Sequence, residues 1–430
     1  MLSIRIVGFR MVLAGLAVLT ALFFGSCGDG GVLGTSDSYP TFSLVGAPDR
    51  SLTYEYAISG PGMLPVTGRI AENETRVVVE VPAGPDRLIE ILSVDDVYSG
   101  RTTADIAPGA TTHVTVRLYP GPVFVDYLGQ QIVQIRDMSG VGQRSVGEPD
   151  LDVTTMFRPV DAAYDGTGAL WVPTYDYGYG ELYRFSDLSS DKLEFEDFVP
   201  NSGGPMAVAV DSAAEWLYCA IGYAGENVDI ERYGFDGTPD FQWPLNNLGI
   251  PISATFVSGM TVDSNGYLHV VAADLDQGMA GLLTFNGATG ALVGDFVPLP
   301  GGVPAEYMHM DGPPPIGDIR AVGEDLFVVS AISEPGQPVI FRYNLQLELQ
   351  DSWGVRTESD TPSAGQFWGP RRFVATRNPS QLIVIDQRDG DFGSSGSGRL
   401  VEFRYGTVDG WRVFGDTGEF EFFETGPPMT

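Results

Sequence analysis

The sequence is poor in the residue types on which most catalytic and metal sites depend. Its 430 residues include three histidines and two cysteines, Cys27 and Cys219. His113 and His269 lie in apolar strand patterns, which leaves His309 as the one acid–base candidate. Two cysteines exclude a disulfide framework, and a chain of this length does not need one to hold a core. We therefore expect no cofactor and no metal site.

Basic residues are also scarce. The chain has 24 lysines and arginines against 56 aspartates and glutamates, which gives a net charge of −32. A surface of that sign repels phosphate backbones and anionic lipid head groups. The charge argues against nucleic acid as a partner, and it leaves a lipid or an apolar segment as the means of any membrane attachment.

Long helical patterns are missing after the first 25 residues. The chain has instead 55 glycines, 30 prolines and an aromatic content of 11%. Glycine and proline mark turns, and aromatic residues favour sheets, so this mixture predicts many short strands joined by tight turns. The fold class that follows is all-β, on a chain long enough for two or three domains.

The N-terminus carries an export signal. Arg5 and Arg10 precede an uncharged apolar run from Met11 to Phe24, which is too short to span a membrane and typical of a signal peptide. The run ends in Phe24-Gly25-Ser26-Cys27. Two small residues before a cysteine resemble the lipobox of bacterial lipoproteins, although that family usually has Leu, Val or Ile where Phe24 stands.

The resemblance implies cleavage before Cys27 and fatty acylation of its sulfur, with the protein held at the cell envelope by that lipid anchor alone. Residues 1–26 would then be the signal peptide, and the Gly-, Ser- and Asp-rich residues 27–40 a flexible tether. The alternative is an ordinary secretory signal followed by an incidental cysteine.

A small domain is expected over residues 41–119. Three alternating apolar strands, separated by proline- and glycine-containing turns, predict a β-sandwich. They are Arg76–Val81, Arg87–Leu92 and His113–Leu118. Their order resembles small immunoglobulin-like or transthyretin-like modules of exported proteins, which implies a spacer role.

The remaining residues, 120–430, contain a repeat. One strand pattern returns six times at intervals of 48 to 60 residues: Gln131–Arg136, Glu181–Phe185, Asp229–Tyr233, Gly281–Phe285, Val339–Tyr343 and Arg399–Phe403. Five of these copies follow an apolar strand, a turn and a second apolar strand. Periods near 50 residues with several strands each predict a β-propeller, because one small sheet cannot bury both of its faces alone. We expect six blades.

The clearest copy reads Val262-Asp263-Ser264-Asn265-Gly266-Tyr267-Leu268-His269-Val270. This pattern resembles the NHL family of propellers, although the last two copies lack the aspartate. The aspartate suits a turn because its side chain accepts backbone N–H groups. The first copy has Val123–Asp126 as its second strand and no first strand, so we expect residues 419–423 to supply that strand and close the ring.

Ligands of propellers sit at one mouth of the central channel. We expect the loops that enter the first strands to bring Arg158, Asp318, Arg371 and Arg372 together there, where arginines would attract a carboxylate or phosphate. The alternative is that these arginines form salt bridges with Asp161 and Asp318 and only line the channel.

Two tyrosines in one loop, Tyr175 and Tyr177, are further ligand candidates, since exposed tyrosines stack on sugars or on protein partners. They are equally suited to packing over a blade edge. Cys219 lies in an apolar run and is expected to be a buried strand residue rather than a nucleophile.

These expectations favour a non-enzymatic binding or scaffolding lipoprotein of the cell envelope, with a protein or glycan as its partner. The alternative is a propeller hydrolase or lyase with a metal or His309 at the channel mouth.

Overall fold

The computed structural model describes part of the chain. The described residues are 37–38, 41–45, 53–72, 74, 76–93, 98–109, 111–120, 123–126, 131–135, 143–147, 158–165, 167–175, 180–185, 195–198, 203–222, 228–240, 243, 256–303, 316–359, 365–376, 381–387, 398–404 and 412–414. These residues form strands, bridges and turns and no helix. Accordingly, nothing in this part is a helix of the length and apolarity that membrane crossing requires. Cys27, Tyr177, His309 and residues 419–423 lie outside it.

Contacts divide the chain into two units after Tyr119. Among its described residues, the first unit contains three sheets. Its five-stranded sheet has the order β10-β8-β7-β3-β4, with β3 (Tyr54–Ser59), β4 (Val66–Ile70), β7 (Gly84–Ser93), β8 (Tyr98–Ile106) and β10 (Tyr119–Pro120). Its three-stranded sheet has the order β5-β2-β9, with β2 (Thr41–Val45), β5 (Arg76–Val78) and β9 (His113–Arg117). Strands β1 (Asp37–Ser38) and β6 (Val81–Pro82) form a separate pair.

One apolar core joins the two larger sheets of this unit. Side chains alternate between buried and half-buried from Arg87 to Ser93 of β7, as the period of two in a strand requires. Ile89 and Ile91 of β7 pack with Tyr54 of β3 and with Val114 and Val116 of β9. The expected strand patterns at Arg87–Leu92 and His113–Leu118 therefore supply the core of this unit.

The second unit contains six sheets among its described residues, here numbered 1 to 6 along the chain. Sheet 1 has β11 (Val123–Asp126), β12 (Gln131–Ile135) and β13 (Gln143–Gly147). Sheet 2 has β14 (Ala163–Tyr164), β15 (Leu170–Pro173), β16 (Leu182–Phe185) and β17 (Phe195–Phe198). Sheet 3 has β18 (Gly204–Asp211), β19 (Trp216–Gly222) and β20 (Asp229–Gly234).

The later sheets are longer. Sheet 4 has β21 (Phe256–Val262), β22 (Tyr267–Asp274), β23 (Met279–Asn286) and β24 (Leu292–Pro298). Sheet 5 has β25 (Gly317–Val322), β26 (Asp325–Ser330), β27 (Pro338–Asn344), β28 (Leu349–Arg356) and β29 (Gln366–Phe367). Sheet 6 has β30 (Pro370–Phe373), β31 (Gln381–Gln387), β32 (Gly398–Arg404) and β33 (Arg412–Phe414).

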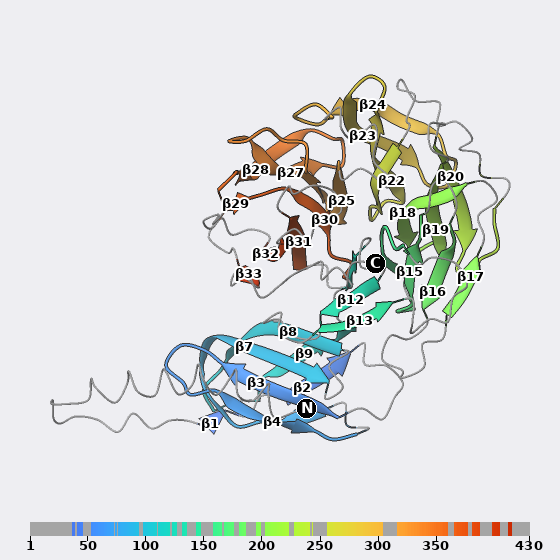
Figure 1. Cartoon of the computed structure of the whole chain (residues 1–430). Helices are drawn as coiled ribbons and strands as arrows, with labels where there is room; N and C mark the ends of the chain where they lie inside the picture. The colour runs from blue at the N-terminus through green and yellow to red at the C-terminus, as the bar shows by residue number, and fades with distance from the viewer. Residues whose placement is uncertain are drawn as a thin grey trace, which may run out of the picture. The chain divides into compact units, whose positions relative to one another are not determined.

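Each sheet is built from strands that follow one another in the sequence and pair antiparallel, except that β29 joins β28 in parallel. The six repeated strand patterns fall on β12, β16, β20, β23, β27 and β32, one in each sheet. Consecutive sheets pack through their first strands, β14 on β18, β18 on β21, β21 on β25 and β25 on β30. Figure 1 shows the sheets in succession around a common centre. This arrangement is a β-propeller.

Burial within the sheets follows strand position. The second strands β19, β22 and β26 are buried along almost their whole length, because neighbouring sheets cover both of their faces. Cys219 lies in β19 and is fully buried, as its apolar context predicts. The fourth strands β24 and β28 are mostly exposed or half-buried.

The first and last sheets touch. Val123 of β11 and Ala375, just after β30, exchange two backbone hydrogen bonds of 2.9 and 2.8 Å in an antiparallel bridge. Strand β11 therefore runs opposite to a first strand, as β15, β19, β22, β26 and β31 do. This direction agrees with the expectation that Val123–Asp126 is a second strand. Val123 also packs against Leu170 of sheet 2, so it contacts sheets on both sides.

Candidate functional site

One register position recurs in sheets 2 to 6, on the first strand or, in sheet 2, two residues before it. In sheets 2 to 5 it lies three residues before the residue that faces a buried leucine of the second strand, namely Leu170, Leu217, Leu268 or Leu326. In sheet 6 it faces Ile385, three residues after the buried Leu382. The residues at this position, here called the first-strand ring, are Asp161, Ala207, Gly259, Asp318 and Arg372. Three of the five residues are charged.

The two aspartates of the first-strand ring each fasten one sheet to the next. Asp161 Oδ2 accepts a hydrogen bond of 2.9 Å from the N–H of Val208 in sheet 3. Asp318 Oδ2 accepts one of 2.8 Å from the N–H of Phe373 in sheet 6. The other oxygen of each carboxylate accepts the N–H of the following residue, at 2.8 Å in both cases. Both side chains are thus held in fixed orientations.

Gly259 makes room for Asp318. A Cβ atom on Gly259 would lie 2.2 Å from Asp318 Oδ1 and 2.9 Å from its Cα, closer than real Cβ contacts come. The requirement for glycine here is one of close approach between β21 and β25.

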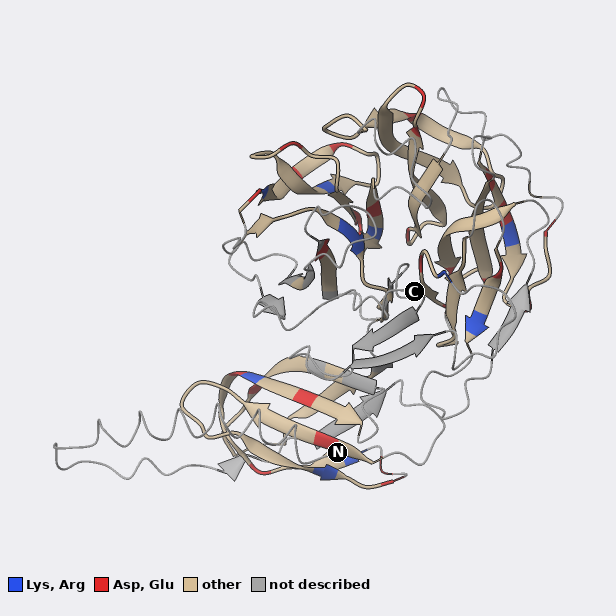
Figure 2. Ribbon diagram, viewed as in Figure 1, with Lys and Arg blue, Asp and Glu red and all other residues tan. Residues whose placement is uncertain are grey.

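Arg372 joins the two ends of the ring. Its Nη1 lies 3.3 Å from Asp161 Oδ1, and both side chains are largely buried, with 14% and 12% of their surface exposed. Arg372 therefore forms the salt bridge with Asp161 that the sequence leaves open as the alternative to a free anion site. Figure 2 shows basic positions on the first strands of sheets 5 and 6, close to the centre of the sheets.

The charges of the ring are unbalanced, because one guanidinium faces two carboxylates. Burial and the nearby charge of Asp161 raise the pKa of Asp318 from 3.8 to about 7, against the opposing effects of Arg372 and two backbone N–H groups. Burial likewise raises the pKa of Asp161, against the attraction of Arg372 and its own two N–H donors. A strongly perturbed pair of this kind is a marker of functional sites.

Several residues expected in loops lie within strands instead. β18, β21 and β30 each contain a bulge, between Pro205 and Ala207, between Val257 and Gly259, and between Pro370 and Arg372. The glycines and prolines that suggest loops in the sequence mark these irregular strand positions. Arg371 is the extra residue of the bulge in β30, and β25 pairs without one.

Of the two roles left open for Tyr175, contact with a ligand or packing within the propeller, the structure supports packing. Its side chain is 6% exposed and packs in the core with Val160 and Met206, because its backbone N–H bonds the carbonyl of Arg158 and pins it beside the first strand. We do not retain Tyr175 as a ligand contact. Tyr177 lies outside the described residues. Arg158 is half-buried and stands three residues before Asp161.

Sequence reasoning missed Arg320, which lies two residues after Asp318 on β25. Its Nη1 and Nη2 donate to the carbonyls of Val374 and Thr376, at 3.0 and 2.6 Å. Residues two apart on a strand share a face, so an aspartate and an arginine at this spacing could have signalled a paired role. Burial lowers the pKa of Arg320 to about 10, although the charge of Asp318 opposes that shift.

The turn aspartates of the repeat are structural. Asp165 Oδ1 accepts the N–H groups of Thr167, Gly168 and Ala169, and its Oδ2 accepts Trp171 Nε1 at 3.0 Å. The turn role expected for this residue type is confirmed.

In sheet 4 a histidine helps to hold the corresponding turn. His269 Nε2 lies 3.1 Å from Asp263 Oδ2, and its Nδ1 lies 2.8 Å from Thr284 Oγ1. Burial alone would raise the pKa of Asp263, but hydrogen bonds from His269 and from backbone N–H groups outweigh it and lower the pKa. This histidine is fully buried and holds a turn to two strands.

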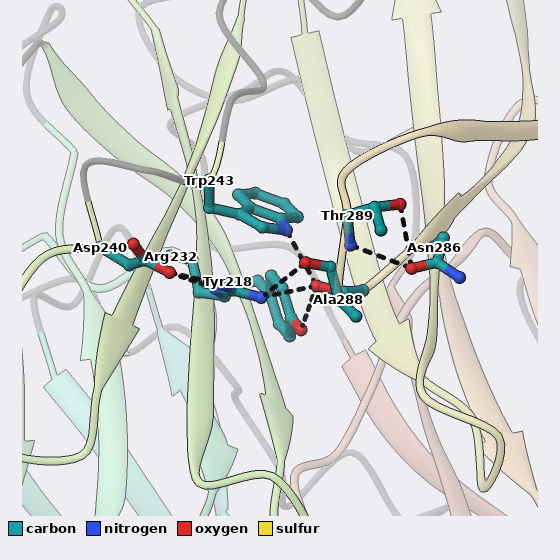
Figure 3. A network of polar contacts seen from close by, with 8 residues as sticks. Tyr218, Arg232, Asp240, Trp243, Asn286, Ala288 and Thr289 are labelled. Atoms are coloured by element: carbon teal, nitrogen blue, oxygen red, sulfur yellow. Dashed lines mark hydrogen bonds and ion pairs between the residues drawn. The ribbon is translucent and has the colours of Figure 1, made fainter.

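A second polar network fastens sheet 3 to sheet 4 (Figure 3). The carbonyl of Gly287 accepts hydrogen bonds from Tyr218 Oη, Arg232 Nη1 and Trp243 Nε1, at 3.1, 2.8 and 2.8 Å. The Arg232 guanidinium also pairs with Asp240 and lies 4.3 Å from the ring centroid of Trp216. We call this network the Gly287 clamp. All of its donors are used within it, so it fastens sheets together and does not form an open site.

No group of three or more histidine, cysteine, aspartate or glutamate residues could hold a metal ion within the described ranges. Within the described residues, the first-strand ring combines buried charged side chains with raised carboxyl pKa values, and its members come from several sheets. Its position near the centre of the propeller makes it the candidate site.

No family model matches the chain, and no curated protein matches it in sequence. Among solved structures it is similar to TolB from Acinetobacter baumannii, with 10% identity and a TM-score of 0.41 over 77% of this chain and 76% of that chain. It is similar to regucalcin, a calcium-binding protein from Agrobacterium tumefaciens, with 11% identity and a TM-score of 0.40 over 72% and 83%. It is also similar to the WD40 β-propeller domain of Doa1, with 13% identity and a TM-score of 0.35 over 59% of this chain and 68% of that chain.

Similarity at these identities and scores assigns no residue roles. The description of the second unit as a propeller rests on the order, pairing and packing of its own sheets.

Proposed function

We propose that this chain is a lipoprotein of the bacterial cell envelope whose propeller binds or scaffolds a protein or glycan partner. Fatty acylation of Cys27 would hold it at the membrane. Residues 41–119 would form a β-sandwich that serves as a spacer, and residues 120–430 an NHL-like propeller that carries the binding surface.

The observation that carries the binding role is the convergence of Asp161, Asp318 and Arg372 from three different sheets. Buried charge of this kind is costly to the fold unless it is compensated. Arg158 and Arg371 stand next to these residues in the sequence and would extend the site toward the channel mouth. A partner with both acidic and basic groups would fit such a surface, because both signs are present.

A photoreactive amino acid at position 371 of the full-length protein tests the binding role in living cells. We expect one cross-linked product of defined mass, which is lost when Arg372→Gln is added. Leu349 on β28 is 54% exposed and serves as the control position. The same product from position 349, or no product from position 371, would contradict the proposed surface. Turnover by the purified protein on hydrolase or lyase substrates would instead favour the enzymatic alternative.

The anchor has an independent test. Metabolic labelling with an alkyne fatty acid should mark the wild-type protein and leave a Cys27→Ser variant unlabelled and released from the membrane fraction. Equal labelling of the two proteins, or membrane retention of the variant without label, would remove the lipoprotein assignment.

We further propose that the propeller closes with six blades. In sheets 2 to 5 the last strand is followed along the chain by the first strand of the next sheet, and β33 ends at Phe414 with sixteen residues still to come. The next strand in that order is the missing first strand of sheet 1, for which residues 419–423 have the alternating pattern. Deletion of the residues after Asp416 should lower the melting temperature of the propeller. An unchanged melting temperature would refute this closure.

A further inference from the structure

Residues 373–376 are held from two sides. On one side, Asp318 and Arg320 of β25 bind the N–H of Phe373 and the carbonyls of Val374 and Thr376. On the other side, Ala375 exchanges two hydrogen bonds with Val123 of sheet 1. The contact between the first and last sheets therefore rests on a segment that the side chains of β25 keep in place.

The charges around Asp318 come from three elements. Asp161 approaches from the segment before β14, Arg372 from β30, and Arg320 from β25 itself. β21, which packs on β25, contributes the uncharged Gly259 and Thr261 at this level. Arg371 and Arg158 flank the cluster in the sequence.

We propose that Asp161, Asp318 and Arg372 form a proton-controlled latch, which fastens the last sheet to its neighbours more tightly as the surroundings become more acidic. The basis is geometric. Arg372 pairs with Asp161, and the nitrogens of Arg320 donate to the carbonyls of Val374 and Thr376. Among the described residues, the buried Asp318 carboxylate therefore has no ion pair of its own. Above neutrality the Asp318 carboxylate is charged beside that of Asp161 without an ion pair of its own, and the repulsion between the two carboxylates loosens the junction.

The direction follows from linkage. The pKa of Asp318 is higher in the folded protein than its ordinary value of 3.8, so the folded state binds the proton more tightly than the unfolded state does. The stabilising contribution of this group is fully present below about pH 4 and is lost as the pH rises through about 7. A carboxylate that is ion-paired in the folded protein usually has a lowered pKa and stabilises the fold more as the pH rises. The pH dependence of the latch has the opposite sign and can therefore be told apart from that of the surface carboxylates.

Hydrogen exchange of the full-length protein tests the latch. Peptides that cover residues 370–376 should exchange about tenfold more slowly at pH 5.5 than at pH 8.5, after correction for the intrinsic exchange rate. Asp318→Asn replaces the carboxyl with a neutral group of the same shape and should abolish this dependence. Asp351→Asn on β28 of the same sheet is the matched control, since Asp351 is exposed and bonds only the N–H of its neighbour among the contacts described.

Asp161→Asn provides a second arm that does not alter Asp318. It removes the repelling charge, so the pH at which protection changes should fall while the dependence itself persists. A pH profile in Asp318→Asn identical to that of the wild type, or slower exchange at alkaline pH, would overturn the proposal. The readout is independent of any ligand, so its failure would leave the proposed binding role untouched.

Discussion

Two boundaries of the propeller are fastened in different ways. Between sheets 3 and 4, the Gly287 clamp uses aromatic rings and one arginine whose charge is balanced by Asp240. Between sheets 5 and 6, Asp318 and Arg320 reach across to backbone groups, and the charge of the surrounding ring is unbalanced. Both boundaries join equivalent sheets of one fold.

The difference shows which boundary serves stability alone. The donors of the Gly287 clamp meet backbone carbonyls and the Asp240 carboxylate, so its charge is balanced and its aromatic rings gain from burial. We expect its contribution to stability to be the same across the neutral pH range. A boundary that depends on a buried carboxylate without an ion pair, here Asp318, is sensitive to protons and to any charged ligand. We therefore expect substitutions at the Gly287 clamp to change stability and substitutions in the first-strand ring to change pH response or binding.

The largest effect is expected from Arg232→Ala. It removes the cation between two tryptophans and leaves Asp240 without its ion pair, so the free energy of unfolding should fall by about 3 kcal/mol. Urea unfolding followed by far-ultraviolet circular dichroism measures it. Arg342→Ala is the control, because the Arg342 guanidinium is more exposed and lies 5.9 Å from the Trp353 ring and 3.8 Å from Asp325. In the Arg342→Ala variant the free energy of unfolding should fall by less than about 1 kcal/mol.

A smaller loss is expected from Gly259→Ala, about 2 kcal/mol, because the new methyl group must displace the Asp318 carboxylate or spread β21 from β25. The cost should be lower in an Asp318→Ala background, where the carboxylate is absent. In Gly302→Ala the added Cβ would lie 3.9 Å from its nearest neighbour, the carbonyl oxygen of Gly278, so the change should be almost neutral. Equal losses at positions 259 and 302 would show that β21 and β25 do not approach as described.

The smallest effect is expected from Tyr218→Phe. The Gly287 carbonyl keeps two other donors, so the loss of the hydroxyl should cost about 1 kcal/mol. The thermal midpoint measures it, and it should be the same at pH 6 and pH 8. A loss that depends on pH in this range would contradict the assignment of the clamp to stability alone.

The sequence predicts the repeat well and the ring poorly. Each strand pattern such as Glu181–Phe185 is local, and its period of two is readable without neighbours. The bulges are different, because Gly259 and Pro370 look like loop residues unless the strand beside them is known.

The site depends on contacts between distant segments. Asp161 and Arg372 are more than 200 residues apart, and only the approach of sheet 6 to sheet 2 brings them within 3.3 Å. The sequence alone points to both residues. It does not decide whether the arginines are free to bind an anion or form salt bridges with the aspartates. The two roles left open for Tyr175 could not be separated for a related reason, since the backbone hydrogen bond to Arg158 that holds it in the core has no signature in the sequence.

The contact between the first and last sheets is the central claim, and a cross-link tests it most directly. Val123 and Ala375 form a hydrogen-bonded antiparallel pair, for which Cα atoms lie about 5.5 Å apart, within the range that a disulfide spans. In the folded protein with Val123→Cys and Ala375→Cys, mild oxidation should give the disulfide-linked peptides in high yield by mass spectrometry, whereas Val123→Cys with Thr261→Cys should give none. Two free thiols at positions 123 and 375 in folded, oxidised protein would contradict the ring.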